Sequence, residues 1–435
     1  MAKPVIVFVG AVYPGQFGRL CAYLRETGQA ESYFLTTPGH CANNPQHADH
    51  LLSFTPDGKI IGPQGYYYSA KVERSARIGR GVLKSLLEFQ KTKKIDVIVA
   101  HSLWGAPHFL YDEIDAAIVS YIEFPSYQAH GWDPKYPPDL AQRMGDKNTE
   151  MLNLHQALRS DLVICPSRHA KQMFPKALQG NIEVQLEGFE FGPDPVRISR
   201  VQGAASLGGS GAEPPTDADD AALGSARERP FTIGFSARDL SSSKGFETYV
   251  RLVDRLVTSG TDAKFVALGG AGVTTYGFEA QWVQRKYGTE SVNFCDHLMR
   301  CYPAAADVIE FPGPLPYDEF VKRIKAIDLF LYPLKFGVAN WGLVEILGRG
   351  GCVLAPDRGY TAELIMDDVN GQLLPDDDDA WIEAVHALQA DPERRARYSR
   401  AASRLARAHY SLSAVAPRYM QLFRQAQDNR KARLR

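Results

Sequence analysis

The sequence contains no closely paired cysteines. Its six cysteines are scattered, and none forms the CxxC pairs typical of a structural zinc site: Cys21, Cys41, Cys165, Cys295, Cys301 and Cys352. Cys295, His297 and Cys301 lie close together, but they offer only three ligands at a spacing that matches no standard metal site. We therefore expect reduced, mostly buried thiols and no bound metal ion.

The chain also lacks an excess of charge of either sign. Its 49 basic and 50 acidic residues give a formal net charge of -1, too little to attract nucleic acid or an anionic membrane. No apolar run approaches the ~20 residues needed to cross a bilayer, and the first ten residues resemble a strand rather than a signal peptide. We expect a cytoplasmic protein with no nucleic-acid partner, whose membrane contact is at most peripheral.

Several common cofactor and nucleophile motifs are missing. The first turn, GAVYPGQFG, does not fit the dinucleotide motif GxGxxG, because only Gly15 and Gly18 have the right spacing. The second strand ends without the acidic residue that would hold a ribose of NAD or FAD. A Walker A loop, a GxSxG elbow and an HExxH helix are also absent from the sequence. These absences argue against dinucleotide-dependent, P-loop, serine-hydrolase and zinc-protease chemistry.

Short apolar runs alternate with helical patterns in the first half of the chain. Their continuous hydrophobicity suits parallel strands buried on both faces of a sheet. The predicted strands are Val5–Gly10, Glu31–Thr37, Lys94–His101, Ala116–Phe124 and Ser160–Ser167. The clearest helices are predicted at residues 17–28 and at Met144–Leu158. This pattern predicts a Rossmann-like domain.

A second series of the same kind follows a stretch rich in Gly, Ala, Ser and Asp at residues 201–230, which we interpret as a disordered insertion. Its predicted strands are Phe231–Leu240, Ala263–Gly270, Asp307–Gly313, Ile327–Pro333 and Gly351–Asp357. We predict an α/β protein with two Rossmann-like domains, residues 1–200 and 231–410, facing across a cleft, where α/β sheets bind ligands. A last helix, residues 411–435, is expected to pack back on the first domain.

The second domain carries groups suited to a nucleotide diphosphate. Arg238 and Lys244 follow a strand and stand beside a helix start, where cations and the helix dipole both favour phosphate. The carboxylate of Glu345 can accept both hydroxyls of a ribose. The exposed amides at Tyr360 and Thr361, where another helix begins, can bind phosphate or sugar oxygens. Together these groups would hold such a ligand at both ends.

With these residues in place, the chain resembles glycosyltransferase family 4, the retaining enzymes of GT-B architecture, over nearly its full length except residues 201–230. In the second half the resemblance rests on Arg238 and Lys244, Phe311-Pro312-Gly313, the WGLVEILGRGG and GYTAELI stretches, and Asn370-Gly371. In the first half, PGQFGRL, His101 with Trp104-Gly105, IEFP and GWDPKYP are similar to a subgroup with a PGQF-type N-terminal loop.

The resemblance implies a role for each matching residue. Arg238 and Lys244 would neutralise the leaving diphosphate, and Glu345 would bind the donor ribose. The diphosphate would also be contacted by the loop Gly359, Tyr360 and Thr361.

Two further loops match positions that face the donor. Gly313 and Leu315 lie where the family's base-contacting loop sits. Gly15 and Gln16 occupy the N-terminal loop that faces donor and acceptor from across the cleft.

Two departures from the family pattern concern the sugar. Gly337 stands where many members have a first glutamate, eight positions before the second, so the sugar contact is expected from Asn340 or Trp341. The family's histidine near the end of a strand is replaced by Glu123, while His101 ends the preceding strand and is either functional or structural.

The resemblance implies transfer of a sugar from a nucleotide-diphosphate donor, such as a UDP- or GDP-sugar, to an acceptor hydroxyl with retention of configuration. The acceptor is expected to be a carbohydrate or glycoconjugate, in polysaccharide or glycoconjugate biosynthesis, and no cofactor or metal is implied. Two alternatives stay open: a phosphorylase or disaccharide synthase on the same fold, or a catalytically silent sugar- or nucleotide-binding module.

Overall fold

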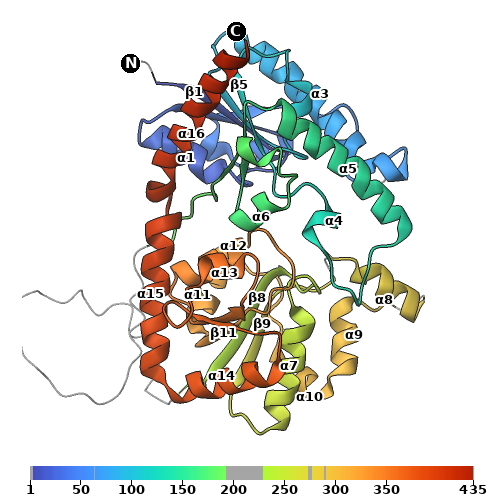
Figure 1. Ribbon diagram of the computed structural model, residues 1–435, viewed down its shortest axis with the longest axis vertical. Helices are drawn as coiled ribbons and strands as arrows, with labels where there is room; N and C mark the ends of the chain where they lie inside the picture. Colours follow the sequence, from blue (N-terminus) through green and yellow to red (C-terminus); the bar gives the residue numbers. More distant parts are fainter. Residues whose placement is uncertain (1–2, 63, 193–228, 273–276, 289–290, 435) are drawn as a thin grey trace, which may run out of the picture.

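The computed structural model describes residues 3–62, 64–192, 229–272, 277–288 and 291–434. Two α/β domains lie one above the other in Figure 1, with a long pair of helices along one side. The insertion predicted at residues 201–230 falls, apart from its last two residues, outside the described ranges.

The N-terminal domain is built on a seven-stranded sheet in the order β3-β2-β1-β4-β5-β6-β7, and every recorded pairing is parallel. Its strands are β1 (Val5–Val9), β2 (Glu31–Thr36), β3 (Leu51–Ser53), β4 (Val97–His101), β5 (Ala117–Tyr121), β6 (Leu162–Cys165) and β7 (Ile182–Val184). Its α-helices are α1 (Gly18–Glu26), α2 (Pro38–Ala42), α3 (Ala70–Gln90), α4 (Tyr127–His130), α5 (Leu140–Arg159) and α6 (Arg168–Gln172). Short 3-10 turns are η1 (Pro45–His47), η2 (Tyr67–Ser69), η3 (Pro107–Phe109) and η4 (Gln179–Asn181).

The C-terminal domain has a six-stranded parallel sheet in the order β10-β9-β8-β11-β12-β13. Its strands are β8 (Thr232–Asp239), β9 (Lys264–Gly270), β10 (Ile309–Glu310), β11 (Leu329–Leu331), β12 (Val353–Pro356) and β13 (Gln372–Leu374). Its helices are α7 (Phe246–Thr258), α8 (Glu279–Tyr287), α9 (Phe294–Cys301), α10 (Pro303–Ala306), α11 (Tyr317–Ala326), α12 (Trp341–Gly348), α13 (Thr361–Leu364), α14 (Asp378–Ala390) and α15 (Pro392–Tyr410). A last helix, α16 (Leu412–Arg433), follows.

The apolar runs of the sequence become strands covered on both faces. All five residues of β1 are buried, and successive side chains point to opposite sides of the sheet. Ile6 and Phe8 pack into the cluster formed with α1 and α16, whereas Val7 and Val9 pack into the cluster formed with α3. This double coverage confirms the predicted α/β class with two Rossmann-like domains.

All ten predicted strands are present, although the one predicted at Asp307–Gly313 is only the two-residue β10. The sequence prediction missed β3, β7 and β13. Each of these has three residues and lies at a sheet edge, so each carries too few buried side chains to leave a periodic signal.

The chain crosses between the domains twice, and the two crossings pair with each other. The amide of Phe189 donates to the carbonyl of Tyr410 at 2.8 Å, and the amide of Leu412 donates to the carbonyl of Phe189 at 3.2 Å. From this point α16 returns to the N-terminal domain and packs against its sheet, as the red helix in Figure 1 shows.

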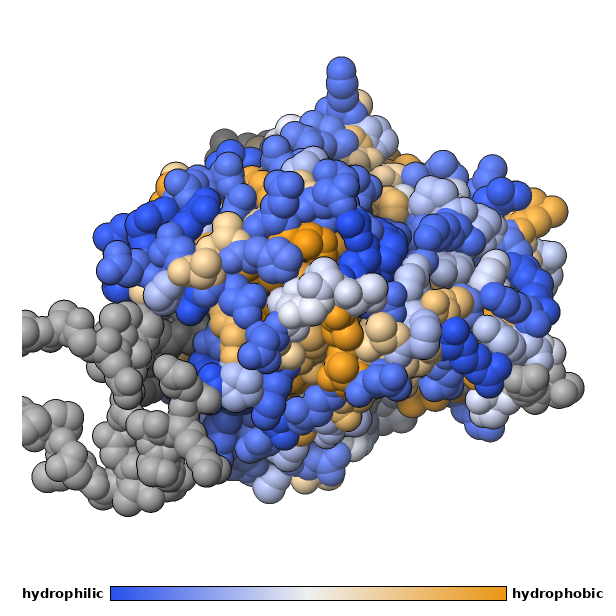
Figure 2. All heavy atoms as spheres, turned by 90° about the horizontal axis from the view of Figure 1, so that it is seen from below, coloured by the Kyte–Doolittle hydropathy of each residue, from blue (hydrophilic) through white to orange (hydrophobic). Residues whose placement is uncertain are grey.

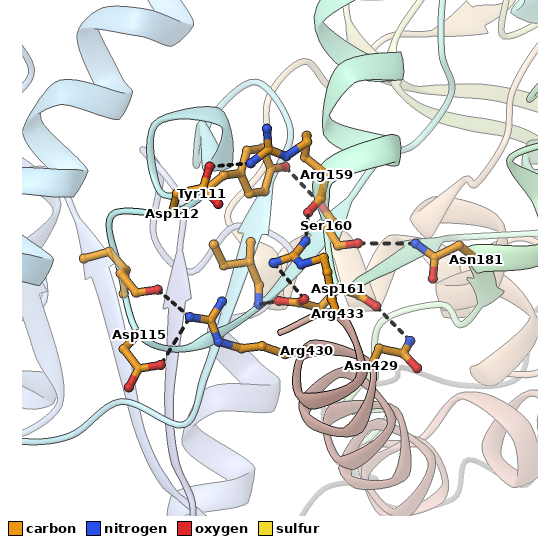
Figure 3. Close-up of polar contacts among 12 residues, drawn as sticks. Tyr111, Asp112, Asp115, Arg159, Ser160, Asp161, Asn181, Asn429, Arg430 and Arg433 are labelled. Carbon is orange, nitrogen blue, oxygen red and sulfur yellow. Dashed lines mark hydrogen bonds and ion pairs between the residues drawn. The ribbon is translucent and has the colours of Figure 1, made fainter. Parts of the chain in front are cut away.

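Polar contacts fasten the end of α16 to the N-terminal domain (Figure 3). Asn429 Nδ2 donates to the carbonyl of Asp161 at 2.8 Å, and Arg433 pairs with the Asp161 carboxylate at 3.1 Å. The same carboxylate accepts the amide of Ile118 in β5 at 2.8 Å. Arg430 reaches the carboxylate of Asp115 at 3.2 Å. The helix thus meets the sheet through charges as well as through apolar side chains.

A segment of the N-terminal domain, Tyr127–Pro138, reaches into the C-terminal domain. Tyr136 is only 3% exposed and belongs to the core cluster of the C-terminal domain, with its ring 5.2 Å from those of Trp282 and Phe294. Its hydroxyl donates to Glu247 Oε2 at 3.0 Å. The segment therefore connects the two domains by burial of an aromatic side chain.

Within the described residues, no helix is both long and apolar enough to cross a membrane. The end of the molecule that lies lowest in Figure 1 is mainly hydrophilic when seen from below, with small apolar areas near its centre (Figure 2).

Candidate active site

The carboxyl ends of central strands from both sheets approach one another where the domains meet. Arg238 lies at the end of β8, His101 ends β4, and Glu123 follows β5 by two residues. Such ends of parallel strands are where α/β domains place ligand-binding side chains.

Lys244 is held at the start of α7 by its local backbone. The next residue, Gly245, has φ +81°, and a Cβ there would lie 1.8 Å from the carbonyl oxygen of Pro333, so only glycine fits. The side chain of Lys244 is 8% exposed, and its Nζ donates to Asn340 Oδ1 at 2.6 Å. A residue of the loop after β8 thus meets the residue that caps α12.

The electrostatics bring four of the predicted residues into one group. Burial lowers the pKa of Lys244 to about 8; Asp239 raises it, Arg238 lowers it further and Glu123 raises it. Burial also lowers the pKa of His101, against the opposing charge of Glu123. Arg238 and Lys244 of the C-terminal domain therefore lie close to Glu123 of the N-terminal domain, which also acts on His101.

His101 is oriented as a hydrogen-bond donor. Its Nδ1 accepts the amides of Leu103 at 3.2 Å and of Trp104 at 3.4 Å. A neutral imidazole whose Nδ1 accepts carries its proton on Nε2. The lowered pKa keeps the ring neutral near pH 7.

Glu345 lies in the middle of α12 within a network of polar groups. Its Oε1 accepts the hydroxyl of Tyr317 at 2.9 Å, and its Oε2 accepts Nε of Arg349 at 3.0 Å. Arg19 of the N-terminal domain reaches Oε1 at 3.4 Å. Both carboxylate oxygens are therefore engaged, and a ribose would share or replace these partners.

The two glycine loops lie beside this network. Gly15 has φ +48°, and Gln16 is followed after two residues by α1, which carries Arg19. Gly313 has φ +72° in the connection between β10 and α11, and Leu315 packs against the core just before that helix. Both loops thus lead into elements that contact Glu345.

The predicted diphosphate loop lies against the other domain. A Cβ on Gly359 would be 3.3 Å from His169 Nε2. Tyr360 is buried, and Thr361 Oγ1 donates to the carbonyls of Pro356 and Arg358, so the side chains of both are used within the domain. What the loop can offer a ligand is its backbone, because the first amides of α13 have no acceptor within the helix.

Glu187 belongs to the first domain crossing and was not predicted from the sequence. Its Oε2 accepts Nε1 of Trp341 at 3.2 Å, next to Asn340 and hence to Lys244. Burial raises its pKa to about 7. The only sequence signal was the pair of acidic residues, Glu187 and Glu190, in the LEGFEF stretch between a strand and the domain boundary.

Gly337 lies next to Asn340, which gives a local reason for a small residue. A Cβ at this position would lie 3.0 Å from Asn340 Nδ2 and 3.4 Å from Leu334. A larger side chain would therefore press on the amide that holds Lys244.

Two family models match the chain. Residues 29–192 match the model described as glycosyl transferase family 4 group, and residues 220–405 match the one described as glycosyl transferases group 1. The chain belongs to the glycosyltransferases. Its two parallel-sheet domains are those of the GT-B type, and the resemblance to family 4 is confirmed at the level of the group. Membership in the subgroup with a PGQF-type loop stays a prediction.

Solved structures with the same fold include sucrose-phosphate synthase from Thermosynechococcus elongatus, at TM-score 0.68 and 15% identity over 98% of this glycosyltransferase and 99% of that chain. HepE of Anabaena, solved with UDP and glucose, has TM-score 0.59 and 15% identity over 97% and 99%. The catalytic domain of starch synthase IV from Arabidopsis thaliana, bound to ADP and acarbose, has TM-score 0.61 and 16% identity over 98% and 100%. No curated protein matches the sequence significantly.

Proposed function

We propose that this glycosyltransferase moves a sugar from a nucleotide-diphosphate donor to a carbohydrate or glycoconjugate acceptor with retention of anomeric configuration, in polysaccharide or glycoconjugate biosynthesis. The observation that carries the proposal is the buried ammonium of Lys244, held by Asn340 and set beside Arg238. Two cations held close together attract an anionic ligand, and a diphosphate supplies two or more negative charges that can form charge-assisted hydrogen bonds with them.

The donor would be held at both ends. Arg238, Lys244 and the first amides of α13 bind the diphosphate in this proposal, and Glu345 accepts hydroxyls of the ribose. To bind the ribose, Glu345 gives up the hydrogen bond that it accepts from the Tyr317 hydroxyl and accepts one from a ribose hydroxyl instead. The exchange costs little free energy because one charge-assisted hydrogen bond replaces a similar one. UDP and ADP are the first nucleotides to test, since similar structures were solved with them.

Breaking the anomeric bond would place negative charge on the diphosphate and positive charge on the sugar. Arg238 and Lys244 stabilise the first, which is electrostatic catalysis, and Glu123 stabilises the second from the opposite domain. The departing phosphate takes the proton of the acceptor hydroxyl on the same face, so configuration is retained and no protein nucleophile is needed. His101 Nε2, Asn340 and Trp341 are the groups proposed to hold the sugar. No metal ion or other cofactor takes part.

The test is nucleotide release from a panel of UDP-, ADP- and GDP-sugars, followed by NMR of the product's anomeric proton. Arg238→Ala and Lys244→Ala are expected to lower turnover by about 100-fold or more, as loss of one charge-stabilising group does in other enzymes. Lys322→Ala, at an exposed lysine of α11, is the matched control and should leave turnover unchanged.

Unchanged turnover in both site variants would remove the assigned roles. An inverted product would exclude front-face transfer. Nucleotide release only with inorganic phosphate present would favour a phosphorylase instead.

A further inference from the structure

A pocket of about 660 Å³ opens beside the transfer site, between the two domains. Its walls are the first half of α5, the Tyr127–Pro138 segment and Phe278, which precedes α8. The volume falls in the range of small-molecule binding sites, roughly 300–1,000 Å³. None of the site residues predicted from the sequence lines this pocket.

Three aromatic rings form one wall. Phe278 of the C-terminal domain meets Tyr127 edge to face, with ring centroids 5.4 Å apart. Trp132 also meets the ring of Phe278, with ring centroids 6.4 Å apart and an interplanar angle of 85°. Such rings offer flat apolar faces to the C–H faces of a pyranose, and Trp132 also carries an indole N–H that can donate a hydrogen bond.

Polar side chains of α5 form the opposite wall. Asp146 accepts the amides of Tyr127 and Gln128 at 2.9 and 3.0 Å, and Glu150 accepts Ser126 Oγ at 2.9 Å. Asp146 therefore holds the backbone of the pocket wall, and Glu150 holds the side chain of Ser126 just before it. Arg143 and Lys147 balance their charge, so the wall is polar with no net charge. That balance suits an uncharged ligand with many hydroxyls.

The chain that follows Trp132 is fixed to the C-terminal domain. Asp133, the next residue, pairs with Lys335 of the C-terminal domain at 2.7 Å, and Tyr136 is buried in that domain's core. A preformed wall of this kind costs a ligand little ordering entropy.

Tyr127 links the pocket to the transfer site. It lines the pocket, and the pKa of its hydroxyl is raised by burial and by Glu123 and Asp146, while Arg238 lowers it. Its side chain therefore borders the pocket and lies near Glu123 and Arg238, so a ligand in the pocket would lie close to the proposed donor site.

We propose that this pocket is an acceptor subsite that binds uncharged sugar units of an oligosaccharide, stacked on Trp132 and Phe278 and hydrogen-bonded by α5. The proposal rests on the proposed function, because it supplies the acceptor for that reaction. A glycan seated here would lie against both domains at once.

The test is binding of the purified protein, with UDP present, to an array of neutral and acidic glycans, followed by titration of the best neutral binder. Trp132→Ala is expected to weaken that binder at least tenfold. Met144→Trp, which adds a ring at the α5 wall, should also weaken it. Met151→Ala, on an exposed position of the same helix outside the pocket, is the matched control and should bind as the wild type does.

Binding to no glycan, a preference for acidic glycans, or unchanged binding in both pocket variants would overturn the proposal. Thermal unfolding of each variant separates lost folding from lost binding. Donor hydrolysis measured without acceptor should stay within twofold of the wild type in Met151→Ala, which lies outside the pocket. If the wild type releases nucleotide from no donor, with or without acceptor, but the glycan titration behaves as expected, the proposed function fails and the pocket is a glycan-binding site without transfer.

Discussion

At the scale of single residues, Lys244 is the group whose chemistry the fold changes most. In an exposed loop a lysine titrates near its ordinary pKa of 10.5, but burial lowers the pKa of Lys244 to about 8. The charge that the proposed reaction needs is therefore lost at a pH only slightly above neutral.

We expect kcat/KM for the donor to fall as the pH rises through about 8, close to tenfold per pH unit, because only the ammonium form favours the diphosphate. Bound diphosphate stabilises the ammonium, so the fall in kcat should begin at higher pH. Lys244→Arg keeps its charge to far higher pH, and its kcat/KM should stay level over that range. Initial rates from about pH 6.5 to 10 check this, and an unchanged alkaline fall in Lys244→Arg would contradict it.

Glu187 gives a second prediction, on stability. Burial raises its pKa from 4.5 to about 7, so the folded state prefers the protonated acid. The contribution of the Glu187 carboxyl group to the unfolding free energy is fully present below pH 4.5 and is lost as the pH rises through 7. The reason is that this group ionises at lower pH in the unfolded chain than in the folded protein. Glu187→Gln keeps an acceptor for Trp341 and has no such dependence.

The variant should therefore match the wild type near pH 4.5 and exceed its unfolding free energy at pH 8 by about 3 kcal/mol, an order-of-magnitude figure for a shift of this size. Urea unfolding at the two pH values measures the difference. If the variant and the wild type differ in unfolding free energy by the same amount at both pH values, ionisation of the Glu187 carboxyl group does not cause the difference.

The sequence predicted the site in part. Arg238, Lys244, Glu123 and His101 could be named because each lies at or shortly after the end of a predicted strand, in stretches that resemble the family, and the structure brings them together. The partners of Glu345 and the position of Glu187 could not be predicted, because Arg19, Tyr317 and Trp341 meet them from distant parts of the chain.

At the scale of secondary-structure elements, the end of α16 shows how a helix is fixed by a few polar groups. Arg433 pairs with a carboxylate of Asp161 that is almost fully buried, and burial raises the pKa of that carboxyl group. The same last turn of α16 also carries Lys431, whose recorded pairing is with Asp428 on the exposed surface.

We expect Arg433→Ala to lower the unfolding free energy by about 1 kcal/mol at pH 7, since the partly exposed arginine is screened by water. Lys431→Ala should change it by less than about 0.5 kcal/mol, as exposed ion pairs contribute little. Urea unfolding followed by circular dichroism distinguishes the two. Equal effects would mean that the contacts in Figure 3 do not hold the helix.

Long elements were predicted better than short ones. The strands β1 and β4 are almost wholly apolar, and α1 buries one face through Leu20, Cys21 and Leu24, so local pattern was sufficient. By contrast, α5 begins at Leu140, four residues before the predicted start, because a capping box between Asp139 and Gln142 sets its first turn.

At the scale of the whole molecule, Tyr136 couples the domains. It comes from the N-terminal domain, yet its ring lies in the core of the C-terminal domain and its hydroxyl binds Glu247. Unfolding one domain would expose this ring, so we expect the two domains of the wild type to unfold together.

Tyr136→Ala should remove about 3–5 kcal/mol, as large-to-small changes of buried aromatic residues do, and should split the calorimetric transition into two. Tyr136→Phe keeps the packing and loses only the hydroxyl, so it should cost about 1.5–3 kcal/mol and preserve a single transition. A single, unshifted transition in Tyr136→Ala would show that the Tyr127–Pro138 segment does not couple the domains.

The sequence by itself determined the fold class, the two-domain order and the membership in the glycosyltransferases, because apolar runs and short motifs depend on residues close together in the chain. Only the tertiary structure decided how far Lys244 is desolvated, which groups engage Glu345, and that an aromatic pocket lies beside Tyr127. Those features arise between residues that are distant in sequence, and burial, charge and cavity shape exist only once the two domains have packed together.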